Sequence, residues 1–429
     1  MTIQEIHTIF LESSGISTDT RTLSSNQLYV ALSGDNFNGN TFAQKSIEQG
    51  AYKAIIDDKD YAGPHTILVE NTLTTLQQLA SYHRTYLNIP IIALTGSNGK
   101  TTTKELINVV LSQKYKTTAT YGNLNNHIGV PLTLLSMTRN TEIGIVEMGA
   151  NHQKEIEELC RIAQPNYGLI TNFGKAHLEG FGGIEGVIKG KSELYTYLKE
   201  NNGIAFINDL DTIQMVQSQE IESRKTLGSE NSDYPITLES ASPTVQIRYK
   251  NTHISTQLIG AYNFSNTAIA VAIGAYFKLP IPSIKKGLES YLPENNRSQL
   301  IHKGSQTIIL DAYNANPTSM EAALRNLKLQ KTKHSIAFIG DMFEVGETAQ
   351  QEHQEILILA QKLGITKVFA IGPSFGLSKP LDSSQQVYKS YDHFVNRPKI
   401  SIPENSTILI KGSRGMKTVS YTHLTLPTS

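Results

Sequence analysis

The stretch Ile91-Ile92-Ala93-Leu94-Thr95-Gly96-Ser97-Asn98-Gly99-Lys100-Thr101-Thr102-Thr103 decides the fold. An apolar run leads into a glycine turn, a lysine and threonines, and apolar residues then recur at helical spacing. This order predicts a strand, a phosphate-binding loop and a helix, because inward-turned backbone N–H groups and a helix N-terminus attract anions. Lys100 adds a positive charge, and the hydroxyl of Thr101 is a candidate ligand for Mg²⁺.

The loop matches the standard pattern G-x-x-x-x-G-K-[ST] incompletely, because Leu94 stands where the first glycine is expected. The alternative interpretation is a glycine-rich surface turn with an exposed lysine. The apolar run before the loop and the helical pattern after it favour phosphate binding.

Length and composition restrict the class of protein. The 429 residues allow two to four domains, and Lys+Arg and Asp+Glu both total 38, so the net charge is zero. This balance gives no indication of a nucleic-acid or anionic-membrane surface and disfavours a nucleic-acid motor. Cys160 is the only cysteine, which excludes an internal disulfide and fits a reducing compartment. Because no signal peptide and no apolar run of the ~20 residues of a membrane span are present, we expect a soluble, cytoplasmic protein.

Residues 89 to about 295 alternate predicted strands and helices, which indicates a parallel sheet. The apolar runs 143–146 and 167–170 end in Glu147 and in a turn that contains His177. Ligands bind beyond the carboxyl ends of parallel strands, so a carboxylate at such an end is a candidate for holding Mg²⁺. Taken singly, Glu147 could be solvated and His177 could be a capping or surface residue; their shared placement favours a function.

The sequence predicts that residues 186–194 open a helix with basic residues in its first turn. Lys189 and Lys191 would lie at the end of the helix that disfavours cations. They could be ordinary surface lysines, or an anion could lie nearby, or one lysine could be modified. Further along, Asn263 and Asn266 could cap a helix at 267–276, and Tyr262 could be a core residue.

Flanking segments complete a prediction of three units, 1–88, 89–295 and 296–429. In the first unit we expect a strand at 27–32, a polar loop at 33–39, a helix at 41–49 and a strand at 54–56. Asp19 and Arg21 could form a surface ion pair or a helix cap, an interpretation that the residues alone favour slightly. In the last unit we expect a helix at 320–329 and strands at 307–310, 335–340, 368–371 and 407–410.

Taken together, these motifs resemble those of the Mur ligases of peptidoglycan synthesis. The resemblance runs from Asp19 to Met416, nearly the whole chain, in the order typical of the family: TGSNGKTTTKE, GNLNNHIGVP, EMGANHQKEI, AHLEGFG, KGKSE, GAYNFSN, DAYNANPTSM, GDMFEVGE and KGSRGM. Residues 313–317 and 340–342 resemble the branch that uses D-alanyl-D-alanine. Sister ligases and folylpolyglutamate synthase carry a histidine-containing sequence at the first of these positions.

The resemblance implies an α/β fold of three domains: a small N-terminal domain for the UDP end of the substrate, a central P-loop ATPase domain with a parallel sheet, and a Rossmann-like C-terminal domain. It implies an ATP- and Mg²⁺-dependent ligase that joins D-Ala-D-Ala to UDP-N-acetylmuramoyl-tripeptide (UDP-MurNAc-tripeptide) through an acyl phosphate in the cytoplasm. We expect this enzyme to be a monomer. The alternatives are a related ligase with a different acid or amine, and a non-catalytic nucleotide-binding protein. The presence of Lys100, Glu147 and Lys191 argues against the latter.

The resemblance also implies roles for residues at matching motif positions. The implied catalytic residues are Lys100, Glu147, His177 and Lys191. The implied ATP contacts are Gly96, Ser97, Asn98, Gly99, Lys100, Thr101, Thr102, Asn263, Arg297 and Asp311. The implied Mg²⁺ ligands are Thr101, Glu147, His177 and Lys191, the last as a carbamate formed with CO₂. The implied substrate contacts are Ser17, Asp19, Arg21, Asn125, Asn126, Asn314, Asn316 and Asp341.

Two features depart from the family pattern. Tyr262 stands where the family often has a histidine, which leaves its contact with the nucleotide open. After Met416 the family usually continues into a helix, whereas residues 417–429 are rich in β-branched residues and contain Pro427. We therefore expect either that roughly the last ten residues are not native sequence or that the true end is missing.

Overall fold

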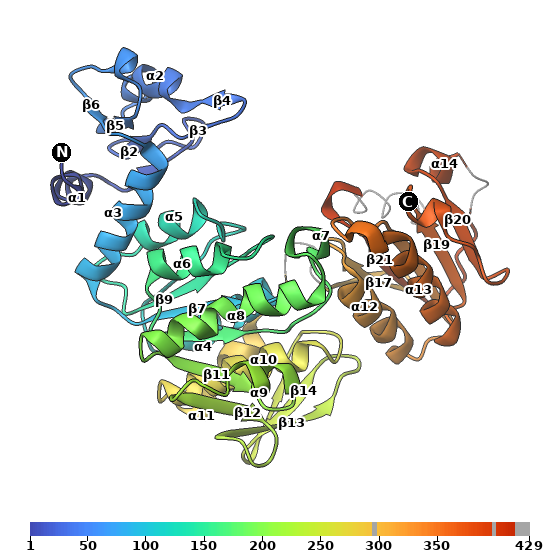
Figure 1. The fold of residues 1–429 in the computed structure, drawn as a ribbon. Coiled ribbons are helices and arrows are strands. Elements are labelled where there is room, and N and C mark those ends of the chain that lie inside the picture. The colour runs from blue at the N-terminus through green and yellow to red at the C-terminus, as the bar shows by residue number, and fades with distance from the viewer. Residues whose placement is uncertain (294–297, 397–399, 417–429) are drawn as a thin grey trace.

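The computed structural model describes residues 1–293, 298–396 and 400–416, which form three large sheets in chain order and a small two-stranded one (Figure 1). The unusual sequence after Met416 lies outside the described residues. Among the helices of the described residues, none has the length and apolar character needed to cross a membrane. The chain therefore has the expected α/β fold of three parts, each built on a mainly parallel sheet.

The N-terminal sheet has four parallel strands in the order β1-β2-β5-β6. Their bounds are β1 Ile16–Ser17, β2 Leu28–Val30, β5 Lys53–Ile56 and β6 Thr66–Leu68. The predicted loop at 33–39 instead contains a hairpin, β3 Ser33–Gly34 and β4 Phe37–Asn38, and the helix after it, α2, spans Ala43–Glu48. Helix α1 (Ile3–Glu12) packs on the long helix α3 (Thr72–Leu87), which leads to the central part (Figure 1).

The central sheet has nine strands in the order β15-β14-β13-β12-β11-β10-β7-β9-β8. The strands that matter for the site are β7 (Ile91–Thr95), β9 (Ile143–Glu147) and β10 (Tyr167–Ile170), which lie side by side and parallel. Residues along β7 and β9 are buried without interruption, as expected for strands covered on both faces. The remaining strands are β8 Thr117–Ala119, β11 Ile204–Asn208, β12 Arg224–Gly228, β13 Tyr234–Ser240, β14 Gln246–Tyr249 and β15 Thr252–Ser255.

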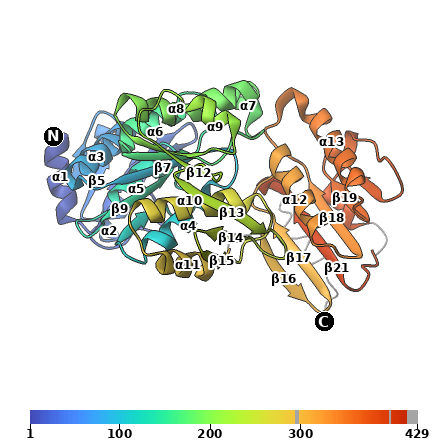
Figure 2. The same cartoon turned by 90° about the horizontal axis from the view of Figure 1, so that it is seen from below.

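Helices cover both faces of the central sheet (Figures 1 and 2). One face packs against α4 Lys100–Leu111, α10 Asn263–Tyr276 and α11 Ile281–Ser290. The other packs against α3, α5 Gly129–Leu135, α6 Glu155–Ala163 and α8 Ile184–Glu200. Two short helices, α7 Leu178–Phe181 and α9 Thr212–Gln217, follow strands β10 and β11.

The C-terminal sheet has six strands in the order β16-β17-β21-β18-β19-β20, of which only β16 runs antiparallel within the described residues. Their bounds are β16 Gln299–Lys303, β17 Gln306–Asp311, β18 His334–Gly340, β19 Lys367–Ile371, β20 Gln385–Tyr388 and β21 Ser406–Lys411. Helices α12 (Pro317–Leu329) and α13 (Ala349–Lys362) cover one face, and α14 (Tyr391–Val395) packs on the other. Strand β21 lies between β17 and β18, so the loops that follow these three strands are neighbours.

Four predicted helix starts were wrong. Helix α2 begins at Ala43 and not at Thr41, helix α12 begins at Pro317 and not at Met320, and the other two bear on the site. Helix α8 begins at Ile184, so Lys189 lies in its second turn and Lys191 at the start of its third, and the acidic Glu185 occupies the first turn. The helix-dipole argument for a nearby anion therefore does not hold. Helix α10 begins at Asn263, so Asn263 and Asn266 belong to the helix and do not cap it.

Candidate active site

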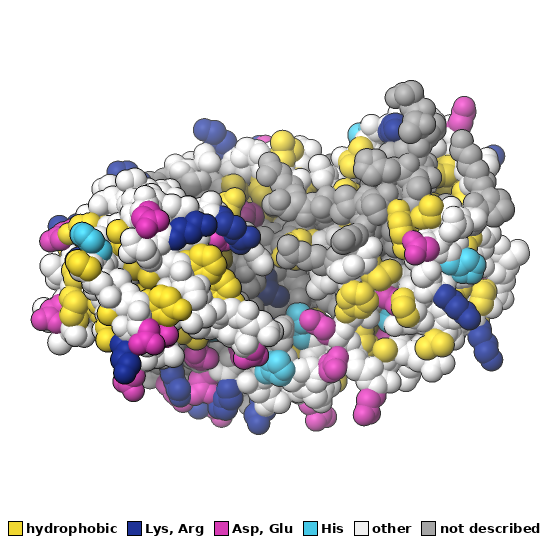
Figure 3. Space-filling model, turned by 90° about the horizontal axis from the view of Figure 1, so that it is seen from above, with side chains coloured by type: hydrophobic (Ala, Val, Ile, Leu, Met, Phe, Trp, Pro, Cys, Tyr) yellow, Lys and Arg dark blue, Asp and Glu magenta, His cyan; other side chains and the backbone are white. Residues whose placement is uncertain are grey.

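A cavity of about 850 Å³ lies between the central and C-terminal sheets, on a face that is visibly hollowed (Figure 3). Its central wall contains residues from the ends of β7 and β9 and from the loops around them: Ser97, Asn98, Lys100, Thr101, Asn125 and Glu147. Its C-terminal wall contains residues from the ends of β17, β18 and β21: Asp311, Asn314, Asn316, Phe343, Glu344 and Lys411. Strand ends from two sheets therefore face each other across one space.

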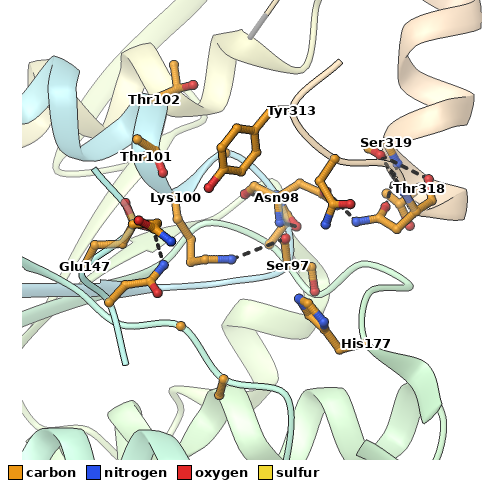
Figure 4. A pocket seen from close by; sticks show the side chains of 18 of the residues that line it. Ser97, Asn98, Lys100, Thr101, Thr102, Glu147, His177, Tyr313, Thr318 and Ser319 are labelled. Carbon is orange, nitrogen blue, oxygen red and sulfur yellow. Dashed lines mark hydrogen bonds between the residues drawn. The ribbon is translucent and has the colours of Figure 1, made fainter. Parts of the chain in front are cut away.

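The loop after β7 has the backbone geometry of an anion-binding turn. Gly96 and Gly99 have φ of 142° and 80°, and a Cβ at Gly96 would lie 2.0 Å from Oγ1 of Thr171. Only glycine fits such a position, and α4 begins directly after the loop with Lys100. The Nζ atom of Lys100 donates to the carbonyl of Gly96 at 2.7 Å, so the side chain lies over its own loop (Figure 4).

Glu147, the last residue of β9, presents a buried carboxylate to the cavity. Its backbone N–H donates to Oγ1 of Thr120 at 2.9 Å, and its Oε1 accepts a hydrogen bond of 2.8 Å from Asn125. Its Oε2 has no hydrogen-bond partner among the described residues. A buried carboxylate oxygen without a donor is well suited to a cation, and Mg²⁺ is commonly held by one or two carboxylates together with substrate phosphates.

The described residues contain no group of three or more histidine, cysteine, aspartate or glutamate side chains placed to hold a metal ion. Thr101 lies on the same wall as Glu147 and supplies a hydroxyl (Figure 4).

His177 also lines the cavity, but its ring is paired with the opposite wall. Its backbone has a left-handed φ of 53°, and its Nδ1 contacts a carboxylate oxygen of Glu344, which follows β18. Burial lowers the pKa of His177, the Glu344 carboxylate opposes that shift, and the positive charges of Lys100 and Lys191 add to it. The histidine joins the two walls in this conformation.

Lys191 on α8 lies just behind the central wall. It is fully buried, its Nζ donates to the carbonyl of Ala150 at 3.2 Å, and it lies 4.9 Å from the ring centre of Phe181. Among the described residues, no carboxylate comes within ion-pair distance of it. Burial holds the pKa of Lys191 well below its usual value, and the charge of Lys100 lowers it further.

Residues expected on the nucleotide side meet at one end of the cavity. Asn263 is buried and donates to the carbonyl of Ile259, while the hydroxyl of Tyr262 lies 2.6 Å from Oγ of Ser298. Burial raises the pKa of Tyr262. Asp311 forms an ion pair of 2.7 Å with Lys411. Arg297, expected beside them, lies outside the described residues.

Four of the expected substrate contacts line the cavity, and four do not. Asn125, Asn126, Asn314 and Asn316 line it, whereas Ser17, Asp19, Arg21 and Asp341 do not. The carboxylate of Asp341 is buried and accepts hydrogen bonds from the backbone N–H groups of Ser374 and Phe375. Within this conformation Asp341 holds a loop of the C-terminal sheet and does not reach the cavity.

Asp19 and Arg21 form an exposed ion pair of 2.6 Å on the N-terminal sheet, as the residues alone favoured. The hydrogen bonds from Arg21 lower the pKa of Asp19 to about 2. The substrate role that the family resemblance implies for them stays a prediction.

The sequence reasoning missed the contacts that join the walls. Asn316 donates to Oδ1 of Asn98 at 2.8 Å, and Lys175 pairs with Glu352 at 2.5 Å. Glu344 and Lys411 were also missed, although each follows or ends a predicted strand, which is the signal that identified Glu147. A pairing between distant segments leaves no comparable signal in one sequence.

Comparisons with known proteins agree with this architecture. Residues 94–274 match the Mur ligase middle domain, and residues 296–414 match the Mur ligase glutamate ligase domain. The UDP-N-acetylmuramoyl-tripeptide–D-alanyl-D-alanine ligase of Bacillus subtilis is 35% identical, over 94% of this chain and 91% of that protein. The enzyme of the same name from Escherichia coli is 32% identical, over 93% and 90%.

Solved structures are similar over the full length. MurF from Acinetobacter baumannii has a TM-score of 0.88 and 29% identity, covering 99% of this chain and 98% of that one. The MurF ligase of Thermotoga maritima in complex with ADP, at 23% identity, shares the fold with a TM-score of 0.84 and coverage of 97% of both chains. From the matched domains and the identity to full-length relatives, the chain belongs to the Mur ligase family.

Proposed function

We propose that this Mur ligase uses ATP to join D-alanyl-D-alanine to UDP-MurNAc-tripeptide. The observation that carries the proposal is the cavity itself, in which a phosphate-binding loop and a buried carboxylate face the polar C-terminal wall. The curated relatives that span the same length are named for this reaction. We place the reaction in the cytoplasm and expect the enzyme to act as a monomer.

The central wall would hold the ATP phosphates and Mg²⁺. The backbone of residues 96–102 would surround the β- and γ-phosphates, and Lys100 would leave the carbonyl of Gly96 to meet them. Thr101 and the unpartnered Oε2 of Glu147 would ligate Mg²⁺. Bound there, Mg²⁺ would offset the charge of the transferring phosphoryl group, which is the main requirement of such a reaction. His177 would join the metal site only after it separates from Glu344.

Lys191 would be carbamylated. Burial lowers the pKa of Lys191 and so favours the neutral amine, whose nitrogen can form a bond to the carbon of CO₂ and release one proton. The product is an anion in place of a cation. This change would give the metal site a further oxygen ligand.

The opposite wall would bind the amine substrate. The tripeptide carboxylate would accept the γ-phosphoryl group, and the amine of D-Ala-D-Ala would attack the resulting acyl phosphate and release phosphate. Asn314 and Asn316 on the C-terminal wall and Asn125 and Asn126 on the central wall would position these groups. Closure of the walls would keep water from hydrolysing the acyl phosphate.

The N-terminal unit would bind the UDP end, through Ser17, Asp19 and Arg21 and the hairpin β3–β4. We propose residues 1–88, 89–295 and 296–429 as the three domains. Asn263 and Asp311 would contact the nucleoside part of ATP. Asp341 would act on the dipeptide only indirectly, because its carboxylate is engaged by backbone N–H groups.

The decisive experiment measures phosphate release from Mg-ATP with UDP-MurNAc-tripeptide present throughout and D-Ala-D-Ala added or omitted. We expect release that depends on the dipeptide, together with a pentapeptide product identified by mass. ATP hydrolysis that does not respond to D-Ala-D-Ala would transfer the assignment to a related ligase with another acid or amine.

A further inference from the structure

The C-terminal wall consists of loops that follow three neighbouring strands, and the middle loop contacts both of the others. The loop after β17 carries Asn314 and Asn316, and the loop after β18 carries Phe343 and Glu344. Strand β21 pairs with both β17 and β18. The residues that follow β21 are therefore placed to fix the spacing between the two outer loops.

Ser413 makes those contacts. Its hydroxyl accepts a hydrogen bond of 2.9 Å from the backbone N–H of Phe343 and donates to the carbonyl of Ala315 at 3.3 Å. Its own N–H donates to the carbonyl of Asp341 at 3.1 Å. One buried side chain thus bridges the two loops, through the residues that lie beside Asn314 and Glu344.

The burial of Ser413 argues against direct contact between its side chain and a substrate. Only 1% of the residue is exposed, and it does not line the cavity. Its hydroxyl already donates one hydrogen bond and accepts another, so no donor remains for a substrate. Lys411 makes a parallel contact by donating to the carbonyl of Asn314 at 3.1 Å, but it reaches only the loop after β17.

We propose that Ser413 is a positioning residue that holds the two outer loops of the C-terminal wall in the register required for the amine substrate. This inference rests on the proposed function for the identity of that substrate. Removal of the hydroxyl would leave the N–H of Phe343 and the carbonyl of Ala315 without their partner, and the loops could then separate. The loss would weaken binding of the ligand between the two loops and would affect ATP binding on the central wall much less.

The test uses steady-state kinetics of the full-length enzyme. For Ser413→Ala we expect the KM for D-Ala-D-Ala to rise about tenfold, as for the loss of one buried hydrogen bond, with a change in the KM for ATP below about twofold. Ser378→Ala is the matched control, because Ser378 is a buried serine between β19 and β20 whose hydroxyl has no hydrogen-bond partner among the described residues. An unchanged KM for the dipeptide in Ser413→Ala would overturn the proposal.

A second pair of variants isolates the hydroxyl from effects on folding. Ser413→Thr and Ser413→Val have nearly the same shape and differ in the hydroxyl, so they remain informative where Ser413→Ala is unstable. We expect Ser413→Thr to bind the dipeptide at least fivefold more tightly than Ser413→Val. Equal values for the two variants would overturn the role of the hydroxyl.

Hydrogen exchange distinguishes failure of this inference from failure of the proposed function. We expect Ser413→Ala to increase amide exchange in residues 312–316 and 341–346, whereas Ser378→Ala leaves both segments unchanged. If the wild-type enzyme ignores D-Ala-D-Ala, the proposed function fails and exchange alone decides whether Ser413 holds the loops. Unchanged exchange in both segments would overturn the inference whatever the substrate is.

Discussion

The two walls of the cavity each depend on a buried lysine, and the two lysines have opposite surroundings. Lys191, behind the central wall, has a backbone carbonyl and an aromatic ring as its neighbours and no ion pair among the described residues. Lys411, in the C-terminal wall, pairs with Asp311 at 2.7 Å and also donates to the carbonyl of Asn314. A buried ammonium without a carboxylate is unfavourable, whereas a buried, hydrogen-bonded pair is balanced.

The carboxylates of the two walls differ in the same way. One oxygen of Glu147 has no partner among the described residues, whereas Asp311 is neutralised by Lys411. Within the described part of the chain, the central wall thus keeps a buried carboxylate oxygen without a partner, whereas the buried charges of Asp311 and Lys411 on the C-terminal wall balance each other. Unsatisfied buried groups mark the place where a ligand completes the structure. The comparison assigns chemistry to the central wall and positioning to the C-terminal wall.

The largest expected effect is that of Lys191→Ala on turnover. We expect kcat to fall about a thousandfold, which corresponds to about 4 kcal/mol, with the fold intact and partial rescue by short carboxylates such as formate. Lys189→Ala is the matched control, since Lys189 is exposed on the same helix. Wild-type turnover in Lys191→Ala would remove this lysine from the mechanism and contradict the chemical role that we assign to the central wall.

Glu147→Gln is expected to have the next largest effect. The amide keeps an oxygen for the hydrogen bond from Asn125 but removes the negative charge from the cavity. We expect about a hundredfold lower kcat and a higher Mg²⁺ requirement, measured by titration of Mg²⁺ at saturating ATP. The control is Glu142→Gln, an exposed residue just before the same strand. An unchanged Mg²⁺ requirement would count against Glu147 as a ligand.

The central wall was also the part of the site that the sequence predicts best. Strands β7, β9 and β10 are continuous apolar runs whose ends carry polar residues, so their pattern identifies both the sheet and the residues at its edge. Half-exposed strands such as β8 and β13 carry no such run and were not predicted. Helix α8 starts two residues earlier than predicted. Lys191 is therefore distinguished by its burial and not by its position in the helix dipole.

The C-terminal wall was less predictable for a physical reason. Its loops were located, but the pairs that fix them, Lys411 with Asp311 and Glu344 with His177, join residues that are distant in sequence. Asp341 directly follows a strand, and Glu147 ends one. The carboxylate of Asp341 nevertheless accepts hydrogen bonds from the backbone of Ser374 and Phe375 and does not face the cavity. Position at a strand end predicts where a side chain starts and does not predict which partner it finds.

A third prediction concerns stability, for which we expect Lys411 to matter more than Lys191. Lys411→Met leaves a mostly buried Asp311 without its partner, so we expect the free energy of unfolding to fall by about 2 kcal/mol. Lys191→Met removes a buried amine that forms no ion pair with any residue the structure describes, so we expect no loss of stability. Denaturant unfolding measures both. Equal destabilisation by the two substitutions would contradict the difference that we draw between the walls.

The smallest predicted effect is on ATP binding and comes from removing Asp311, the carboxylate that pairs with Lys411. Asp311→Ala is expected to weaken ATP binding about tenfold and to change binding of UDP-MurNAc-tripeptide by less than twofold, as measured by calorimetry. The substitution would also leave Lys411 buried without an ion pair, as Lys191 is. The double variant Asp311→Ala/Lys411→Met separates the two consequences, because it removes the unpaired charge but does not restore the carboxylate. If ATP affinity recovers in the double variant, the carboxylate serves only to balance Lys411; if it stays low, Asp311 itself contacts the nucleotide, and the C-terminal wall takes part in binding ATP as well as in positioning the amine.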